Sequence, residues 1–242
     1  MTSEILISPE PQALIDTALA LIVERILTAV GERQSCAIAL SGGSTPQPLY
    51  AALAGADLPW QQIHIFWGDE RYVPAEHPDS NYGMAKQVWL DLVPIPPANI
   101  HPMPTDLTEP QLAAAEYERQ ITTYFVPATG AIPVFDIILL GIGDDGHTAS
   151  LFPHTAALTV VDRLVTIGDK DGQPRITFTF PLINQARSVI FLISGTSKQA
   201  ALAEIFAPMG DLAAYPARGV RPQGELLWLL DAAAGEQLGS GT

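Results

Sequence analysis

Short apolar runs alternate with amphipathic stretches along the whole chain. The apolar runs predict strands at Cys36–Leu40, Ile63–Trp67, Ile100–Met103, Phe135–Gly141, Arg163–Ile167, Ile176–Phe180, Ser188–Ser194 and Glu225–Leu230. The stretches between them predict helices over residues 11–30, 46–54, 80–92, 109–124, 181–186 and 197–207. This alternation is typical of an α/β fold with a doubly wound, mainly parallel sheet and helices on both faces, a Rossmann-like three-layer sandwich.

Two of the apolar runs stand out because they are continuous. Phe135–Gly141 and Ser188–Ser194 have the composition of central strands that are buried on both faces. The proline-rich segment 93–104 is short and leads back into regular elements, so we interpret it as a surface connection. The length of 242 residues and a hydrophobic share of 48% suit one core. We therefore predict a single domain over residues 1–242, with a frayed tail at 239–242.

Charge and cysteine content narrow the range of partners. The chain carries 26 acidic residues against 12 Lys and Arg, a net charge of −14, which disfavours nucleic acid. The longest apolar helical stretch, 13–30, contains Asp16, Glu24 and Arg25, so we predict no signal peptide and no membrane association. The single Cys36 excludes an intrachain disulfide and fits a reducing compartment, the cytoplasm. A small anion is still compatible, because one close cation outweighs distant, screened charges.

Polar loops directly after predicted strands are the candidates for chemistry, since ligands bind an open parallel sheet beyond the carboxyl ends of its strands. The first loop consists of Ser41, Gly42, Gly43, Ser44, Thr45 and Pro46. Its glycines allow a ligand to approach the backbone, Thr45 can N-cap the next helix, and Pro46 suits the first turn of that helix. This loop is a candidate phosphate cradle. It lacks the Walker motif and the full dinucleotide motif, and an ordinary tight turn is the alternative.

The second loop, GDERYVP at residues 68–74, supplies Asp69 and Arg71. The planar guanidinium of Arg71 suits bidentate phosphate binding, although a solvated turn can have the same composition. Further along, Asp79-Ser80-Asn81-Tyr82 has the sequence of a helix cap that can also line a pocket.

The third loop reads GIGDDGHTASLFP at residues 141–153. Packing at the end of a buried strand does not require Asp144, Asp145 and His147. A histidine transfers protons near neutral pH, and a nearby carboxylate fixes its tautomer, so we favour catalysis. Metal binding is the alternative, but the spacing matches neither the His-Glu-x-x-His motif nor a calcium loop, and we predict no metal and no cofactor.

Two further cations complete the candidate site. Lys198 follows the strand at 188–194 and lies in the first turn of the next predicted helix, where its charge opposes the helix dipole unless an anion binds there. A solvated surface lysine is the alternative. Arg175 precedes a predicted strand and is either a second phosphate ligand or a surface residue.

In their order along the chain, these loops resemble the 6-phosphogluconolactonase family, which is similar to the glucosamine-6-phosphate isomerases. The matching stretches are 41–46, 68–74, 79–84, 141–153, 175–181, 194–198 and 224–231, which span nearly the whole chain. The resemblance implies a doubly wound α/β sandwich. It also implies hydrolysis of 6-phospho-D-glucono-1,5-lactone to 6-phosphogluconate in the oxidative pentose phosphate pathway.

The resemblance further implies roles for individual residues. His147 would be the general base that activates water, and Arg71 and Lys198 would hold the phosphate. Asp69 and Asp145 would be pocket carboxylates, with roles that the motifs do not separate. The expected partner is a small sugar-phosphate lactone, and the chain is expected to be a monomer or a weak homo-oligomer.

Two other functions stay open. In the isomerases the Asp-Gly-His motif is followed by Ile-Ala-Phe-Asn-Glu-Pro, and Phe152 stands here at the place of that glutamate. A phenyl ring cannot carry a proton, so isomerase or deaminase activity is disfavoured, although Asp69 stands at the place of the isomerases' proton-abstracting acid. A non-catalytic sugar-phosphate-binding module is the other alternative, but the chain has no room for a fused DNA-binding domain.

Overall fold

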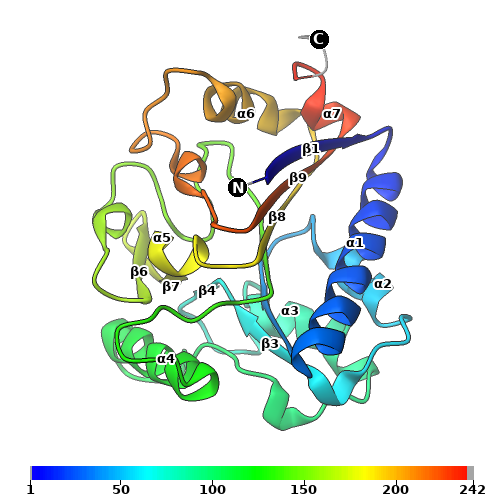
Figure 1. Cartoon of the computed structure of the whole chain (residues 1–242). Coiled ribbons are helices and arrows are strands. Elements are labelled where there is room, and N and C mark those ends of the chain that lie inside the picture. Colours follow the sequence, from blue (N-terminus) through cyan, green and yellow to red (C-terminus); the bar gives the residue numbers. More distant parts are fainter. Residues whose placement is uncertain (1, 239–242) are drawn as a thin grey trace.

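The computed structural model of the chain describes residues 2–238, and within them a six-stranded parallel sheet runs in the order β1-β9-β8-β5-β2-β3 (Figure 1). These strands are β1 (Thr2–Ser8), β2 (Cys36–Leu40), β3 (Ile63–Trp67), β5 (Ile137–Leu140), β8 (Ser188–Ile193) and β9 (Glu225–Asp231). A second, antiparallel sheet contains β4 (Asp69–Arg71), β7 (Gln173–Phe178) and β6 (Val165–Lys170), in that order.

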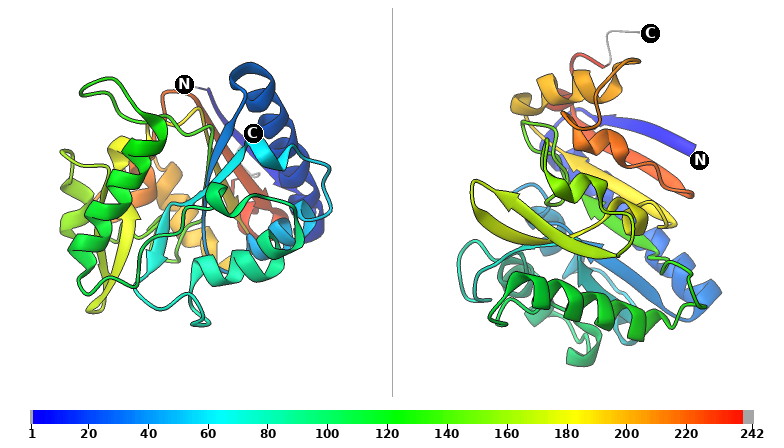
Figure 2. Two further views of the ribbon diagram at one scale, coloured as in Figure 1. Left: turned by 90° about the horizontal axis from the view of Figure 1, so that it is seen from below. Right: turned by 90° about the vertical axis from the view of Figure 1, so that its left-hand side faces the viewer.

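Helices cover the main sheet on both faces. The α-helices of the described residues are α1 (Pro11–Arg33), α2 (Gln47–Leu53), α3 (Asn81–Val88), α4 (Pro110–Phe125), α5 (Phe180–Ile183), α6 (Gln199–Phe206) and α7 (Ala232–Gly235). Figures 1 and 2 show α1 and α2 on one face, and α4 with the small sheet on the other. The predicted three-layer α/β architecture is therefore confirmed, with the small sheet as an added part of one outer layer.

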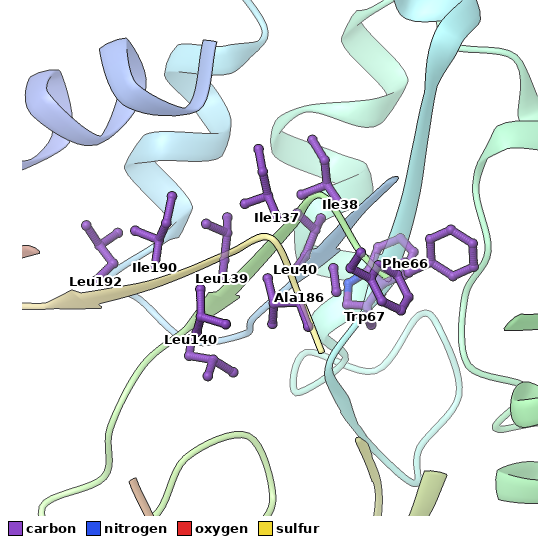
Figure 3. Packing of buried hydrophobic residues seen from close by; sticks show 14 of the residues in the cluster. Ile38, Leu40, Phe66, Trp67, Ile137, Leu139, Leu140, Ala186, Ile190 and Leu192 are labelled. Atoms are coloured by element: carbon purple, nitrogen blue, oxygen red, sulfur yellow. The ribbon is translucent and has the colours of Figure 1, made fainter. Parts of the chain in front are cut away.

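The two continuously apolar runs lie in the middle of the main sheet, as predicted. Every residue of β5 and β8 is buried. Leu139 of β5 pairs in register with Ile190 of β8, and Figure 3 shows their side chains packed beside one another. A strand in this position has layers on both faces, so it needs no polar alternation.

One predicted strand is wrong, and two others belong to a different sheet. Ile100–Met103 forms no strand; Ile100 makes a single bridge to Ile65, and Pro102 has no N–H for a ladder. The runs predicted at 163–167 and 176–180 are shifted to β6 and β7, which pair with each other as a hairpin and not with the parallel sheet.

Two strands and one α-helix of the described residues were not predicted from the sequence, namely β1, β4 and α7. The edge strand β1 leaves Ile5 and Ile7 about two-fifths exposed, so it lacks a continuous buried apolar pattern. The four-residue helix α7 depends on Asp231, which caps it by accepting from the Ala234 N–H. A helix this short has no periodic pattern to detect.

The ends of the other helices differ by a few residues from the predicted ones. In particular, Pro46 and not Thr45 is the N-cap of α2. Ser80 caps α3 as predicted, with its hydroxyl accepting from the Gly83 N–H. In the part of the chain that is described, no helix has both the length and the apolar character needed to cross a bilayer. The predicted frayed tail, 239–242, lies outside the described residues.

Candidate active site

A cavity of about 260 Å³ opens where β2, β3, β5 and β8 end. Most of the candidate residues line it: Ser41, Gly42, Gly43, Ser44, Asp69, Arg71, His147, Arg175 and Lys198. Asp145 is not part of the lining, but its carboxylate contacts the His147 ring. Parallel strands bring these loops together because their carboxyl ends share one edge of the sheet.

His147 and Asp145 form a hydrogen-bonded pair within one tight loop. Asp145 Oδ1 lies 2.5 Å from His147 Nδ1 and also accepts from the His147 backbone N–H at 3.1 Å. Gly143 provides the space, since a Cβ there would overlap the imidazole and the Asp145 carboxylate. Gly146 has φ 77°, a conformation that favours glycine. The loop thus holds the imidazole with Nδ1 toward the carboxylate.

The protonation of this pair follows from burial and contact. Burial lowers the pKa of His147 below its usual value, and Asp145 offsets part of that effect. Burial raises the pKa of Asp145, but the hydrogen bonds and charge of His147 outweigh it and leave the pKa lowered. At neutral pH the imidazole is therefore neutral and the carboxylate ionised. With Nδ1–H donated to Asp145, the lone pair of His147 is on Nε2.

Phe152 packs against the other side of the histidine. Its side chain is buried, and its ring centroid lies 4.5 Å from that of His147. Two cations lie near the same ring: Arg175 Cζ is 5.4 Å and Lys170 Nζ 5.7 Å from its centroid. The Phe152 ring therefore lies close both to the imidazole of His147 and to two cationic side chains.

Arg71 and Arg175 lie side by side on adjacent strands of the small sheet. They are directly paired residues of β4 and β7, and both line the cavity. Arg71 donates to the Asp79 carbonyl at 2.6 Å. Within residues 2–238, neither guanidinium Nε has a hydrogen-bond acceptor. Burial, together with repulsion by Arg71, lowers the pKa of Arg175. Two adjacent guanidiniums with unused donors are suited to a doubly charged anion.

Lys198, the third cation of the cavity, is paired with a counter-ion. Its Nζ lies 2.6 Å from Asp144 Oδ1, which also accepts from the Ser197 hydroxyl at 3.0 Å. These hydrogen bonds lower the pKa of Asp144. Buried Asp231 holds the loop that carries Lys198, because its carboxylate accepts hydrogen bonds from the Ser194 hydroxyl and the Gly195 N–H.

Asp69 is buried and held by Ser150, whose hydroxyl donates to Asp69 Oδ2 at 2.6 Å. The Asn81 amide donates to the Asp69 carbonyl at 2.9 Å, and Asn81 also lines the cavity. Gly42 is required beside it, since a Cβ on Gly42 would overlap the Asn81 side chain. The amide thus connects the first and second loops.

Glu70 points away from the cavity and joins β4 to α3. Its carboxylate accepts from the backbone N–H groups of Arg71, Asn81 and Tyr82 at 2.8 to 2.9 Å and from the Ser80 hydroxyl at 3.1 Å. Burial raises the pKa of Glu70, and the three N–H donors offset part of this effect. No role for Glu70 was predicted from the sequence. Its position between the candidate site residues Asp69 and Arg71 is the feature that could have indicated one.

The loop after β2 is shaped by a buried tyrosine. The Tyr50 hydroxyl accepts from the Ser41 N–H and donates to the Ser41 carbonyl. Gly43 has φ 97°, which favours glycine there. In the described part of the chain, no three His, Cys, Asp or Glu side chains are grouped as metal ligands would be.

Comparisons with known proteins agree with one another. The profile of a family described as glucosamine-6-phosphate isomerases/6-phosphogluconolactonase matches residues 9–228. The chain is 63% identical to a 6-phosphogluconolactonase of Synechocystis sp. over 94% of its own length and 95% of that protein's. It is 56% identical to a 6-phosphogluconolactonase of Nostoc sp., covering 98% and 99% of the two chains.

Solved structures give the same result. A structure of 6-phosphogluconolactonase from Trypanosoma brucei superimposes with a TM-score of 0.86 at 33% identity, covering 98% of this chain and 99% of that one. The structure of 6-phosphogluconolactonase from Thermotoga maritima gives a TM-score of 0.84 at 32% identity, covering 95% and 100%.

Proposed function

Because this chain belongs to the family of glucosamine-6-phosphate isomerases and 6-phosphogluconolactonases, we propose that it hydrolyses 6-phospho-D-glucono-1,5-lactone to 6-phospho-D-gluconate. This is the lactone-opening step of the oxidative pentose phosphate pathway. The observation that carries the proposal is one cavity lined by a neutral histidine and three cations. A proton acceptor and a phosphate-sized cationic wall are what hydrolysis of a phosphorylated lactone requires.

In the proposed reaction, His147 is the general base. Its Nε2 takes a proton from water as the water oxygen bonds to C1 of the lactone. The tetrahedral intermediate then collapses, the bond between C1 and the ring oxygen breaks, and the imidazolium returns the proton to that oxygen. The carboxylic acid formed at C1 then releases its proton to solvent, which gives the carboxylate of the product. Asp145 keeps Nδ1 protonated and stabilises the imidazolium. A lactone carbonyl is electrophilic enough that no covalent enzyme intermediate is needed.

The cations hold the substrate by its phosphate. Arg71, Arg175 and Lys198 supply the charge, and the backbone N–H groups of Gly42, Gly43 and Ser44 supply further donors in the same cavity. Anchoring one end of the sugar brings C1 within reach of the water that His147 activates. The binding of the phosphate thereby places the reacting atoms in the geometry that the reaction needs. Asp69 contributes a carboxylate to the cavity, oriented by Ser150.

Isomerisation is the second candidate, and Phe152 argues against it. An apolar ring buried against the imidazole supplies no carboxylate for a proton relay. The expected cytoplasmic location and the expected monomeric or weakly oligomeric state stay predictions.

The test is proton release after addition of freshly made lactone, corrected for spontaneous ring opening. We expect His147→Ala to lower kcat by about 10²- to 10⁴-fold, and Lys198→Ala mainly to raise KM. Wild-type turnover in the His147 variant would contradict the general base. Release of ammonia from glucosamine 6-phosphate would favour the isomerase, and binding of the lactone without turnover would favour a sensor.

A further inference from the structure

The ion pair between Lys198 and Asp144 is a second feature of the cavity wall. The Lys198 side chain lines the cavity and is 21% exposed, whereas Asp144 is 66% exposed and lies outside the lining. Asp144 belongs to the loop that carries His147, and Lys198 belongs to the loop after β8. The pair therefore links the loop of the general base to a loop of the anion site.

The position of Asp144 is electrostatically unfavourable for an anion site. A phosphate bound to Lys198 Nζ has to share the ammonium with a carboxylate that is already 2.6 Å away. The pair of arginines has no such counter-ion at its buried Nε atoms within residues 2–238. Asp144 therefore removes part of the attraction that three cations would otherwise exert.

A weaker attraction of the cavity for anions is useful in the proposed reaction. Opening a lactone creates a carboxylate, so the product carries one negative charge more than the substrate. A site with three uncompensated cations would bind the product more tightly than the substrate and would slow its release. An internal carboxylate on one of the cations lowers the affinity for both anions, and lowers it more for the product, which carries the additional charge.

Resting on the proposed function, we propose that Asp144 is a specificity-determining residue that weakens anion binding at Lys198 and so favours release of the product. Asp144→Asn is the informative variant. An asparagine side chain still accepts hydrogen bonds from Lys198 and Ser197, so the lysine stays in place while the negative charge is lost.

The experiment measures the dissociation constant of 6-phosphogluconate by calorimetry and the inhibition constant of inorganic phosphate, both at low ionic strength. We expect Asp144→Asn to bind both ligands about two- to fivefold more tightly, the range for a pair of exposed charges. The gain should disappear near 1 M salt, where charges are screened within about 3 Å. Asp162→Asn is the matched control, because it removes an exposed ion-paired carboxylate away from the cavity and should change neither constant.

Two further outcomes separate the inference from the function on which it rests. Unchanged or weaker binding in Asp144→Asn, with clearly weaker binding in Lys198→Ala, would overturn the role of Asp144 alone. Unchanged binding of both ligands in Lys198→Ala would overturn the assignment of the phosphate to Lys198, and the role of Asp144 with it.

Discussion

Phe152 illustrates, at the scale of a single residue, how an apolar side chain controls a polar site. Its ring covers the imidazole of His147 and keeps water from that face. Exclusion of water lowers the pKa of a histidine, because the charged form loses hydration. A carboxylate at the same place would have the opposite effect. The residue at 152 therefore contributes to the pH range in which His147 accepts a proton.

Replacing the ring should move the pH profile. We expect Phe152→Leu to raise the pKa of His147 toward its usual value, so that the acidic limb of kcat/KM moves to higher pH, with a several-fold loss of kcat. Phe152→Ala should show the same shift and a loss of about 3 to 5 kcal/mol in the free energy of unfolding. The shift is measured by pH–rate profiles of the folded variants, and the loss of stability by unfolding in urea.

The control is Phe206→Leu, since Phe206 packs on Trp228 and does not line the cavity. An acidic limb that stays in place in Phe152→Leu would show that the ring does not tune the histidine.

At the scale of elements, the site depends on how β4 is joined to α3. Glu70 holds that joint by accepting four hydrogen bonds, two at each carboxylate oxygen. Its neighbours in sequence, Asp69 and Arg71, line the cavity, as does Asn81 at the start of α3. Alternation along the strand sends Glu70 to the opposite side. One buried carboxylate thus positions three residues of the cavity wall.

Glu70→Gln tests this arrangement. In this variant an NH₂ group replaces one carboxylate oxygen, and it would face two hydrogen-bond donors that then lack an acceptor. We therefore expect a loss of about 1 to 3 kcal/mol in the free energy of unfolding. Because Arg71 and Asn81 shift, KM should rise several-fold with a smaller change in kcat. Steady-state kinetics and thermal unfolding measure the two effects. Glu76→Gln, which replaces an exposed carboxylate in the neighbouring loop, is the control. A loss of stability with unchanged KM would mean that Glu70 is structural only.

The small sheet was predicted less completely from the sequence than the main sheet. Asp171 and Gly172, with φ 55° and 80°, form the two-residue turn of the β6–β7 hairpin. An Asp-Gly pair is a strong hairpin signal, but Pro174 and the charged residues beside the turn led the two predicted strands to be placed too far from it. The central strands β5 and β8 were predicted because continuous burial leaves a continuous apolar run.

At the scale of the whole molecule, the sequence could predict which loops meet but not how their side chains pair. The meeting of Arg71, His147 and Lys198 at one cavity follows from the shared edge of parallel strands. The contact between Ser150 and Asp69 joins residues 81 positions apart, and that between Lys198 and Asp144 joins residues 54 apart. No local pattern encodes such distances, because they are set by packing between layers.

Packing at the edge of the main sheet also makes stability depend on pH. His101 follows the bridge between Ile100 and Ile65, which covers the free side of β3. Its ring stacks on Phe66, with centroids 4.3 Å apart, and its Nε2 lies 3.2 Å from His64 Nδ1. Burial, with a smaller contribution from His64, lowers the pKa of His101 to about 4. The segment that protects this edge is therefore held by a histidine that is neutral in the folded state.

The folded state should consequently lose stability in mild acid. As the pH falls from about 6.5, the unfolded chain takes up a proton on His101 before the folded chain does, and the difference is complete near pH 4. After allowance for partial exposure of the ring, we expect a loss of about 1 to 2 kcal/mol over this range. His101→Phe keeps the stacking on Phe66 but cannot titrate, so its free energy of unfolding in urea should fall less steeply with pH than that of the wild type. Parallel curves for the two proteins between pH 7 and 4 would show that protonation of His101 is not coupled to unfolding.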